Sequence, residues 1–258
     1  MKRFVDVLVP VCAALLSAAC TPPQKDAQQN FDLMKRISYN SVTEGTGRYG
    51  RGETNKYMLT GTGVVVGDKY LTVDHVVSRY EKVTYFGLST SRIPYVARRE
   101  RTYLLSGTRR IPLEEIVNDR ALDIAVFRIP REYCDGVCNG MGVSDLYSGV
   151  IPLGRDVMFI GFPAEIGFYY RESKFAGMVK KGKEYNGRTI PVDAIAIYPS
   201  LITGDSGSGL FDKDTGRLMG INYYNIQTLG LVKPIALFEP YLNSAPTIAY
   251  RTETAPVM

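Results

Sequence analysis

Short runs of β-branched and aromatic residues recur through most of this chain, and glycine, proline or asparagine separates them. No long stretch has the 3.6-residue spacing of apolar positions that marks an amphipathic helix. Short strands at regular spacing are typical of antiparallel sandwiches and barrels, so the pattern predicts an all-β protein. The apolar runs occupy residues 57–66, 70–73, 83–86, 124–129, 157–162 and 194–198.

Composition narrows the class of protein further. Hydrophobic residues make up 45% of the chain and charged residues 22%, as in ordinary globular proteins. The net charge of +5 is modest, and the short basic clusters at 98–101 and 109–110 fit solvated strand faces, so we expect no nucleic-acid partner. One histidine and no zinc-type cysteine spacing do not make a typical metal hydrolase site, so we expect no metal and no cofactor.

The first twenty residues have the features of a secretory signal. Lys2 and Arg3 precede a mostly apolar stretch at 7–16, which is shorter than the about 20 apolar residues that a membrane span needs. The ending Leu16-Ser-Ala-Ala-Cys20 is similar to a bacterial lipoprotein lipobox, although its leucine lies one position earlier than usual. This similarity implies lipidation of Cys20, export to the periplasm or cell envelope, and membrane attachment. The alternative is a plain signal peptide in which Cys20 is incidental.

Two cysteines, Cys134 and Cys138, remain after the predicted signal and its lipidation site. Gly136 lies between them and permits a tight loop. In an oxidising export compartment we expect the two thiols to form a local disulfide that constrains little chain entropy. Two free thiols on a surface loop are the alternative.

Three separated segments carry the residue types of a serine-histidine mechanism. The lone histidine ends Thr72-Val-Asp-His75, a carboxylate heads Asp123-Ile-Ala-Val126, and a serine lies within Gly204-Asp-Ser-Gly-Ser-Gly209. In this order the segments resemble the active-site segments of trypsin-like serine peptidases, and most closely the bacterial branch that contains the HtrA and glutamyl-endopeptidase families. The resemblance covers about residues 55–242. It implies two antiparallel six-stranded β-barrels of the chymotrypsin-like type with the active site between them.

The resemblance also implies a role for each residue. His75 is expected to be the general base, Asp123 its orienting carboxylate and Ser206 the nucleophile, with the backbone N–H groups of Gly204 and Ser206 forming the oxyanion hole. Asp119 is a rival for the carboxylate, but its neighbours favour a polar turn. Because the imidazole must be neutral to accept a proton, we expect activity to rise with pH through the neutral range.

The segments also indicate what else this chain can be. No histidine follows the serine, which excludes the residue order of α/β-hydrolases. Asp74 stands before His75 where the family usually has a small residue, and a second carboxylate there can compete for the imidazole. This departure favours the alternative function, a catalytically inactive barrel protein that binds peptides or envelope partners.

The family positions that border the substrate pocket carry neutral residues here. By resemblance they are Ser200, Thr203 and the segment that includes Asn222, Tyr223 and Tyr224. A neutral pocket implies a protein or peptide substrate with a small-to-medium or apolar residue before the cleaved bond. The strand edge is expected to pair with an extended substrate backbone. The two tyrosines have the alternative interpretation of ordinary strand aromatics.

The sequence predicts four successive segments. A polar stretch rich in glutamine and asparagine favours a tether with a short helix near 31–37, and a glycine-rich connector at 134–151 divides the peptidase domain. Nothing after Leu242 resembles a second module, so we expect no PDZ domain. The segments are a signal peptide at 1–20, a tether at 21–46, a peptidase domain at 47–245 (halves at about 47–145 and about 150–245) and a tail at 246–258.

Overall fold

The computed structural model describes residues 27–49, 54–78, 81–86, 89–162, 167–185, 188–200, 205–226 and 228–243. The predicted signal peptide with Cys20 and the predicted tail at 246–258 lie outside these residues, as do Thr203 and Gly204. Within the described ranges, no helix is both long enough and apolar enough to cross a membrane.

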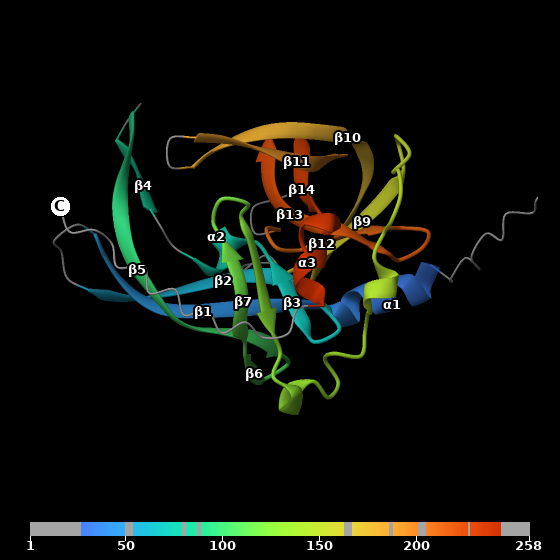
Figure 1. The fold of residues 1–258 in the computed structure, drawn as a ribbon, viewed down its shortest axis with the longest axis horizontal. Helices are drawn as coiled ribbons and strands as arrows, with labels where there is room; N and C mark the ends of the chain where they lie inside the picture. The colour runs from blue at the N-terminus through green and yellow to red at the C-terminus, as the bar shows by residue number, and fades with distance from the viewer. Residues whose placement is uncertain are drawn as a thin grey trace, which may run out of the picture.

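The first half of the described chain forms one antiparallel eight-stranded sheet (Figure 1). Its strands are β1 (Ser38–Tyr49), β2 (Asn55–Val66), β3 (Lys69–Thr72), β4 (Glu81–Phe86), β5 (Ser89–Ser106), β6 (Arg109–Pro112), β7 (Glu114–Asp119) and β8 (Ile124–Arg128). The order is β4-β5-β1-β2-β3-β8-β7, and β6 pairs with β5. The 18-residue strand β5 pairs with three partners along its length, which makes this an open, enlarged sheet where a closed six-stranded barrel was predicted.

The second half forms a closed six-stranded barrel in the described chain, in the order β10-β11-β14-β13-β12-β9 (Figure 1). Its strands are β9 (Asp156–Gly161), β10 (Tyr169–Tyr185), β11 (Arg188–Tyr198), β12 (Gly209–Asp212), β13 (Leu218–Ile226) and β14 (Leu229–Pro234). The short helices are α2 (Asp74–Val77), η1 (Arg131–Tyr133), η2 (Val143–Asp145), η3 (Ile235–Leu237) and α3 (Glu239–Leu242). The predictions of an all-β fold and of a six-stranded second barrel are confirmed.

The segment predicted to be a tether is instead folded. Residues 27–46 contain helix α1 (Ala27–Ile37) and most of β1, which pairs with both β2 and β5. Met34 and Ile37, which lie three residues apart on one helix face, are fully buried. The folded part of the chain therefore begins before residue 47.

Hydroxyl side chains account for the misleading polarity of β1. Ser41 and Thr43 are buried, and each hydroxyl has a hydrogen-bond partner on another strand. The Ser41 hydroxyl donates to the Gly61 carbonyl at 3.4 Å, and the Thr43 and Thr102 hydroxyls are 3.1 Å apart. Because a buried polar group is tolerated when it is hydrogen-bonded, this strand reaches the interior without an apolar run.

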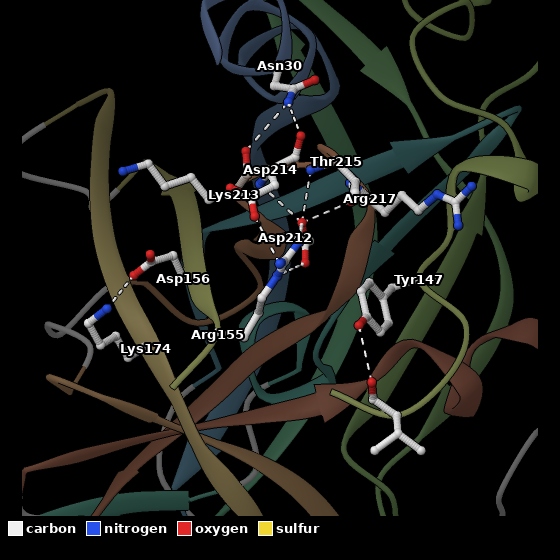
Figure 2. A network of polar contacts seen from close by, with 11 residues as sticks. Asn30, Tyr147, Arg155, Asp156, Lys174, Asp212, Lys213, Asp214, Thr215 and Arg217 are labelled. Atoms are coloured by element: carbon white, nitrogen blue, oxygen red, sulfur yellow. Dashed lines mark hydrogen bonds and ion pairs between the residues drawn. The ribbon is translucent and has the colours of Figure 1, made fainter. Parts of the chain in front are cut away.

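Helix α1 is also fastened to the second half of the protein. The side-chain amide of Asn30 donates to the carbonyl of Asp214 at 3.0 Å and to that of Lys213 at 3.5 Å (Figure 2). These carbonyls belong to the turn between β12 and β13. Asn30 is 1% exposed, so the helix lies tightly over this turn.

One hydrophobic core joins the two halves. It contains Val64 and Phe127 from the first sheet together with Phe211 and Ile221 from the barrel, all almost completely buried. A second, smaller core lies within the barrel around Phe159 and Leu210. Since the larger core spans both halves, it fixes the position of each against the other.

The predicted local disulfide is present in the connector between the halves. Cys134 and Cys138 are bonded, with their Cα atoms 4.9 Å apart. The Cys134 carbonyl also accepts hydrogen bonds from the N–H groups of Val137 and Cys138, so the loop is a single tight turn.

Candidate active site

His75 lies in α2, a single helical turn that follows β3. Val76 and Val77 are buried and anchor this turn in the core, whereas the His75 side chain is 43% exposed. The two valines thus hold the imidazole at the surface, where it can meet a substrate.

The structure brings Asp123 directly against this imidazole. Both carboxylate oxygens lie 3.1 Å from His75 Nδ1, and one of them also accepts the His75 backbone N–H at 3.1 Å. Asp123 is 10% exposed at its side chain and has a left-handed backbone with φ of 58°, a conformation that aspartate tolerates better than most residues. A carboxylate at Nδ1 favours the tautomer in which Nε2 has a free lone pair, as a general base requires.

Asp119, the alternative candidate for the orienting carboxylate, makes a different contact. Its carboxylate accepts the backbone N–H of Leu122 at 2.9 Å and so closes the turn that leads to Asp123. The sequence interpretation of the Asp119 segment as a polar turn is consistent with this contact.

Ser206 lies in the tight turn that precedes β12, and it is partly exposed. The turn is closed by a hydrogen bond from the Ser208 N–H to the Asp205 carbonyl at 3.0 Å. Gly207 donates its N–H to the Asn222 carbonyl at 2.7 Å, which ties the turn to β13.

Gly207 places this turn against the strands that lead to His75. Its φ of 88° is left-handed, and a Cβ at this position would collide with the Thr62 carbonyl of β2 and lie 2.5 Å from the Thr72 hydroxyl of β3. Thr72 in turn donates to the Thr62 carbonyl at 2.7 Å. Only glycine fits such a close approach, and Thr72 is three residues before His75. The turn that holds Ser206 therefore packs against β2 and β3, and β3 leads into the helix that holds His75.

Buried hydrogen bonds that join Asn222, Ser208 and Asp205, which the sequence did not predict, stabilise this turn. The Asn222 side-chain amide donates to the Ser208 hydroxyl at 2.6 Å, and this hydroxyl donates to the Asp205 carbonyl at 2.6 Å. Asn222 and Ser208 are fully buried. Asn222, predicted to border the substrate pocket, thus contacts the turn and does not face solvent. No local sequence pattern signals the contact between Asn222 and Ser208, because the two residues are 14 positions apart in the chain.

Of the other predicted pocket residues that the structure describes, Ser200 and Tyr224 reach the surface and Tyr223 is buried. Ser200 is partly exposed and its carbonyl accepts a hydrogen bond from Arg171 at 2.9 Å. Tyr224 is 50% exposed, whereas Tyr223 is 7% exposed. Burial raises the pKa of Tyr223 to about 12, and the negative charge of Asp123 contributes to this rise.

Asp74, the residue that precedes His75 in the chain, is 2% exposed at the start of α2. Within the part of the chain that the structure describes, no cluster of three or more histidine, cysteine or acidic side chains is arranged to hold a metal ion.

A closed antiparallel barrel, a second antiparallel sheet, and a histidine–aspartate pair beside a glycine-bounded serine define the chymotrypsin-like class of fold. The sequence profile of the trypsin-like peptidase domain matches residues 61–221, which is more than half of the chain, and the protein belongs to this family.

Solved structures share the fold at low sequence identity. The active form of the Rv3671c protease from M. tuberculosis superposes with a TM-score of 0.62 and 17% identity, over 88% of this chain and 90% of that one. The HtrA-type protease AlgW, solved with a decapeptide, matches with a TM-score of 0.58 and 16% identity, over 84% of this chain and 66% of that one. No curated protein sequence matches the chain.

Proposed function

We propose that this protein is a serine endopeptidase that cleaves peptide bonds through Ser206, His75 and Asp123. The observation that carries the proposal is the carboxylate of Asp123 at 3.1 Å from His75 Nδ1, with the Ser206 turn packed against β3, which leads to this histidine. This geometry leaves Nε2 of the imidazole as the base for a serine hydroxyl.

The reaction would proceed in two steps. His75 accepts the Ser206 proton while the serine oxygen attacks the substrate carbonyl, and it then returns the proton to the leaving amine. A water molecule, activated by the same imidazole, hydrolyses the acyl-enzyme. Asp123 stabilises the imidazolium in both steps, and the N–H groups of Ser206 and Gly204 are the proposed donors to the oxyanion.

The proposed substrate is an extended peptide that pairs with β13 beyond the stretch Leu218–Ile221 that pairs with β12, where β13 pairs with β14 on its other side. Tyr224 offers an exposed aromatic surface there, and the segment carries no charged side chain from Gly220 to Asn225. We propose a neutral residue before the cleaved bond. AlgW, an HtrA-type protease with the same fold, was solved with a decapeptide, which supports a peptide as the substrate.

A catalytically inactive, peptide-binding protein is the second candidate. The buried Asp74, which precedes His75 in the chain, favours it, because a second carboxylate favours the protonated imidazolium, which cannot accept the serine proton.

A fluorophosphonate probe separates these two functions. The folded wild type should be labelled at neutral pH and should cleave casein or a peptide library, whereas Ser206→Ala should do neither. Labelling and cleavage should both increase from pH 5 towards neutral, as the histidine loses its proton. An unlabelled, folded wild type would support the inactive binder, and a flat profile from pH 5 to 9 would argue against His75 as the base.

We extend the proposal to export and lipid attachment at Cys20. The basic start, short apolar stretch and small residues before this cysteine support it. In a bacterial host fed with labelled palmitate, the chain should take up label and enter the membrane fraction. Cys20→Ser should abolish both, and equal labelling of the variant would refute the lipobox.

A further inference from the structure

Lys233 is a lysine in the middle of the barrel wall. It lies on β14 between β11 and β13, opposite Ile221, and it is fully buried. Removing an ammonium group from water is costly unless the surroundings favour its charge.

The ammonium group of Lys233 stacks on the ring of Tyr223. Nζ lies 4.0 Å from the ring centroid, well inside the distance at which the face of an aromatic ring attracts a cation. The ring is 7% exposed, so water screens this contact little. The Tyr223 hydroxyl has no hydrogen-bond partner within the described ranges, which leaves the stacked face as the ring's main polar contact.

Tyr223 connects this buried cation to the catalytic pair. Its ring belongs to the same hydrophobic cluster as Val73 and Val76, which flank His75, and Ile124, which follows Asp123. The charge of Asp123 is also one of the influences that raise the pKa of the Tyr223 phenol. Lys233, the ring and the carboxylate thus lie in one buried region.

We infer that Lys233 is a positioning residue for the catalytic pair: its buried ammonium group stabilises the ionised Asp123 and disfavours positive charge on His75. The inference rests on the proposed function, because it assigns Lys233 a part in the chemistry of the triad. It also offsets the effect of Asp74, which adds a second carboxylate next to the imidazole.

Among the other buried charged side chains of the described residues, Asp74, Asp205 and Asp212 are carboxylates, and the one other lysine, Lys69, contacts Asp68. Among the described residues, β13 carries Tyr223 and the half-exposed Tyr224 as its titratable groups, and η3 carries none. On β11, Asp193 and Tyr198 are exposed to solvent, which screens them. Lys233 is therefore the cation that is best placed to act on the pair through a dry interior.

The chain has a single histidine, so His75 can be observed alone. In the full chain, prepared with ¹³C-labelled histidine and without a histidine tag, the imidazole resonance gives the pH midpoint of protonation directly. We expect Lys233→Met to move this midpoint upward by about 0.5–1 pH unit, the size of effect that one charge exerts in a partly screened interior. The acidic limb of kcat/KM should move by the same amount, which is about a 3- to 10-fold loss of kcat/KM on that limb.

Two variants separate charge from packing. Lys233→Arg keeps the cation and should leave the midpoint within about 0.2 pH unit of the wild type. Val232→Ala, at the adjacent fully buried position of β14, should lower stability without moving the midpoint. If Lys233→Met does not fold, Lys233→Gln provides the same neutral comparison with a polar head group.

An unchanged His75 midpoint in a folded neutral variant would overturn the inference, and so would an equal shift in Val232→Ala. The readout does not depend on turnover. A wild type that the fluorophosphonate does not label refutes the proposed function, while the titration still decides whether Lys233 acts on His75.

Discussion

Replacing Arg155 by methionine is expected to destabilise the barrel, because it removes the cation from a buried carboxylate. The Asp212 side chain is 0% exposed, and it accepts two hydrogen bonds from Arg155, from Nε at 2.7 Å and from Nη2 at 2.8 Å (Figure 2). The same guanidinium contacts Asp214 at 2.9 Å. Methionine keeps much of the length of the side chain and removes both bonds.

The expected loss in the free energy of unfolding follows from the hydrogen bonds that Asp212 keeps in the variant. One oxygen keeps the N–H groups of Asp214 and Thr215 and the Thr215 hydroxyl, at 2.9–3.1 Å, whereas the other oxygen loses Arg155 Nε. Breaking a buried ion pair by removing one partner costs about 3–5 kcal/mol. Arg155 is 28% exposed, so water can reach the freed oxygen, and we expect the lower end, about 3 kcal/mol. In urea this lowers the midpoint by about 1 M or more.

The loss should depend on pH with a defined sign. Burial by itself raises the pKa of Asp212, but hydrogen bonds from Arg155 and Thr215 outweigh burial and hold it below its ordinary value of 3.8. A lowered pKa stabilises the fold above the ordinary value, and this stabilisation disappears as the pH falls through the folded-state pKa. The difference between wild type and Arg155→Met should therefore be full at pH 7 and shrink below about pH 4.

Urea unfolding at pH 7 and pH 3.5, followed by circular dichroism, measures both effects. Lys174→Met is the control, since it breaks the exposed Lys174–Asp156 pair in the same region and should leave the midpoint unchanged. Arg155→Met combined with Asp212→Asn should recover part of the loss, because the buried charge is gone. A loss of equal size at both pH values, with no recovery in the double variant, would show that packing and not charge is responsible.

Three further changes test the site and its supports. Asp123→Asn should lower kcat/KM by about 10³–10⁴-fold with little change in the unfolding midpoint, because an amide no longer selects the His75 tautomer. A loss of less than tenfold in steady-state kinetics would contradict this prediction. Gly207→Ala should fail to react with the fluorophosphonate, and its free energy of unfolding should fall by at least about 2 kcal/mol, since the added Cβ meets the Thr62 carbonyl. A variant that is labelled and has the stability of the wild type would refute this close approach. Asn30→Ala should cost about 1 kcal/mol and expose α1 to limited proteolysis, and unchanged cleavage kinetics would refute its anchoring role.

The sequence was sufficient where a strand has its own apolar pattern. The predicted runs at 57–66 and 124–129 match β2 and β8 to within two residues at each end, and the run at 194–198 covers the last part of β11. Continuous or alternating β-branched residues leave these segments one stable way to be buried. The resemblance also located the pair of His75 and Asp123, because their local contexts are short motifs.

The sequence was insufficient where a strand depends on distant partners. β1 has buried hydroxyls in place of an apolar run, and Thr43 is satisfied only by Thr102, which is 59 residues away in the chain. The contact between Asn222 and Ser208 and the stacking of Lys233 on Tyr223 are likewise tertiary. Polar residues that a local reading assigns to solvent or substrate are thus buried by pairings that no local pattern specifies.

The placement of these buried polar groups couples the site to the interface between the two halves. The Thr62 hydroxyl accepts the Phe162 N–H at 2.8 Å, and the Thr62 carbonyl accepts Thr72, so one residue of the first sheet binds both the barrel and the strand that leads to His75. Gly207 packs on the same carbonyl from the serine turn. Neither half contains both His75 and Ser206, so under the proposed function a shift of about 1 Å in their docking would lower the rate by about 10²-fold. Variants that loosen these contacts of Thr62 should therefore lose activity while both hydrophobic cores stay folded. A variant that remains folded but is inactive would show this.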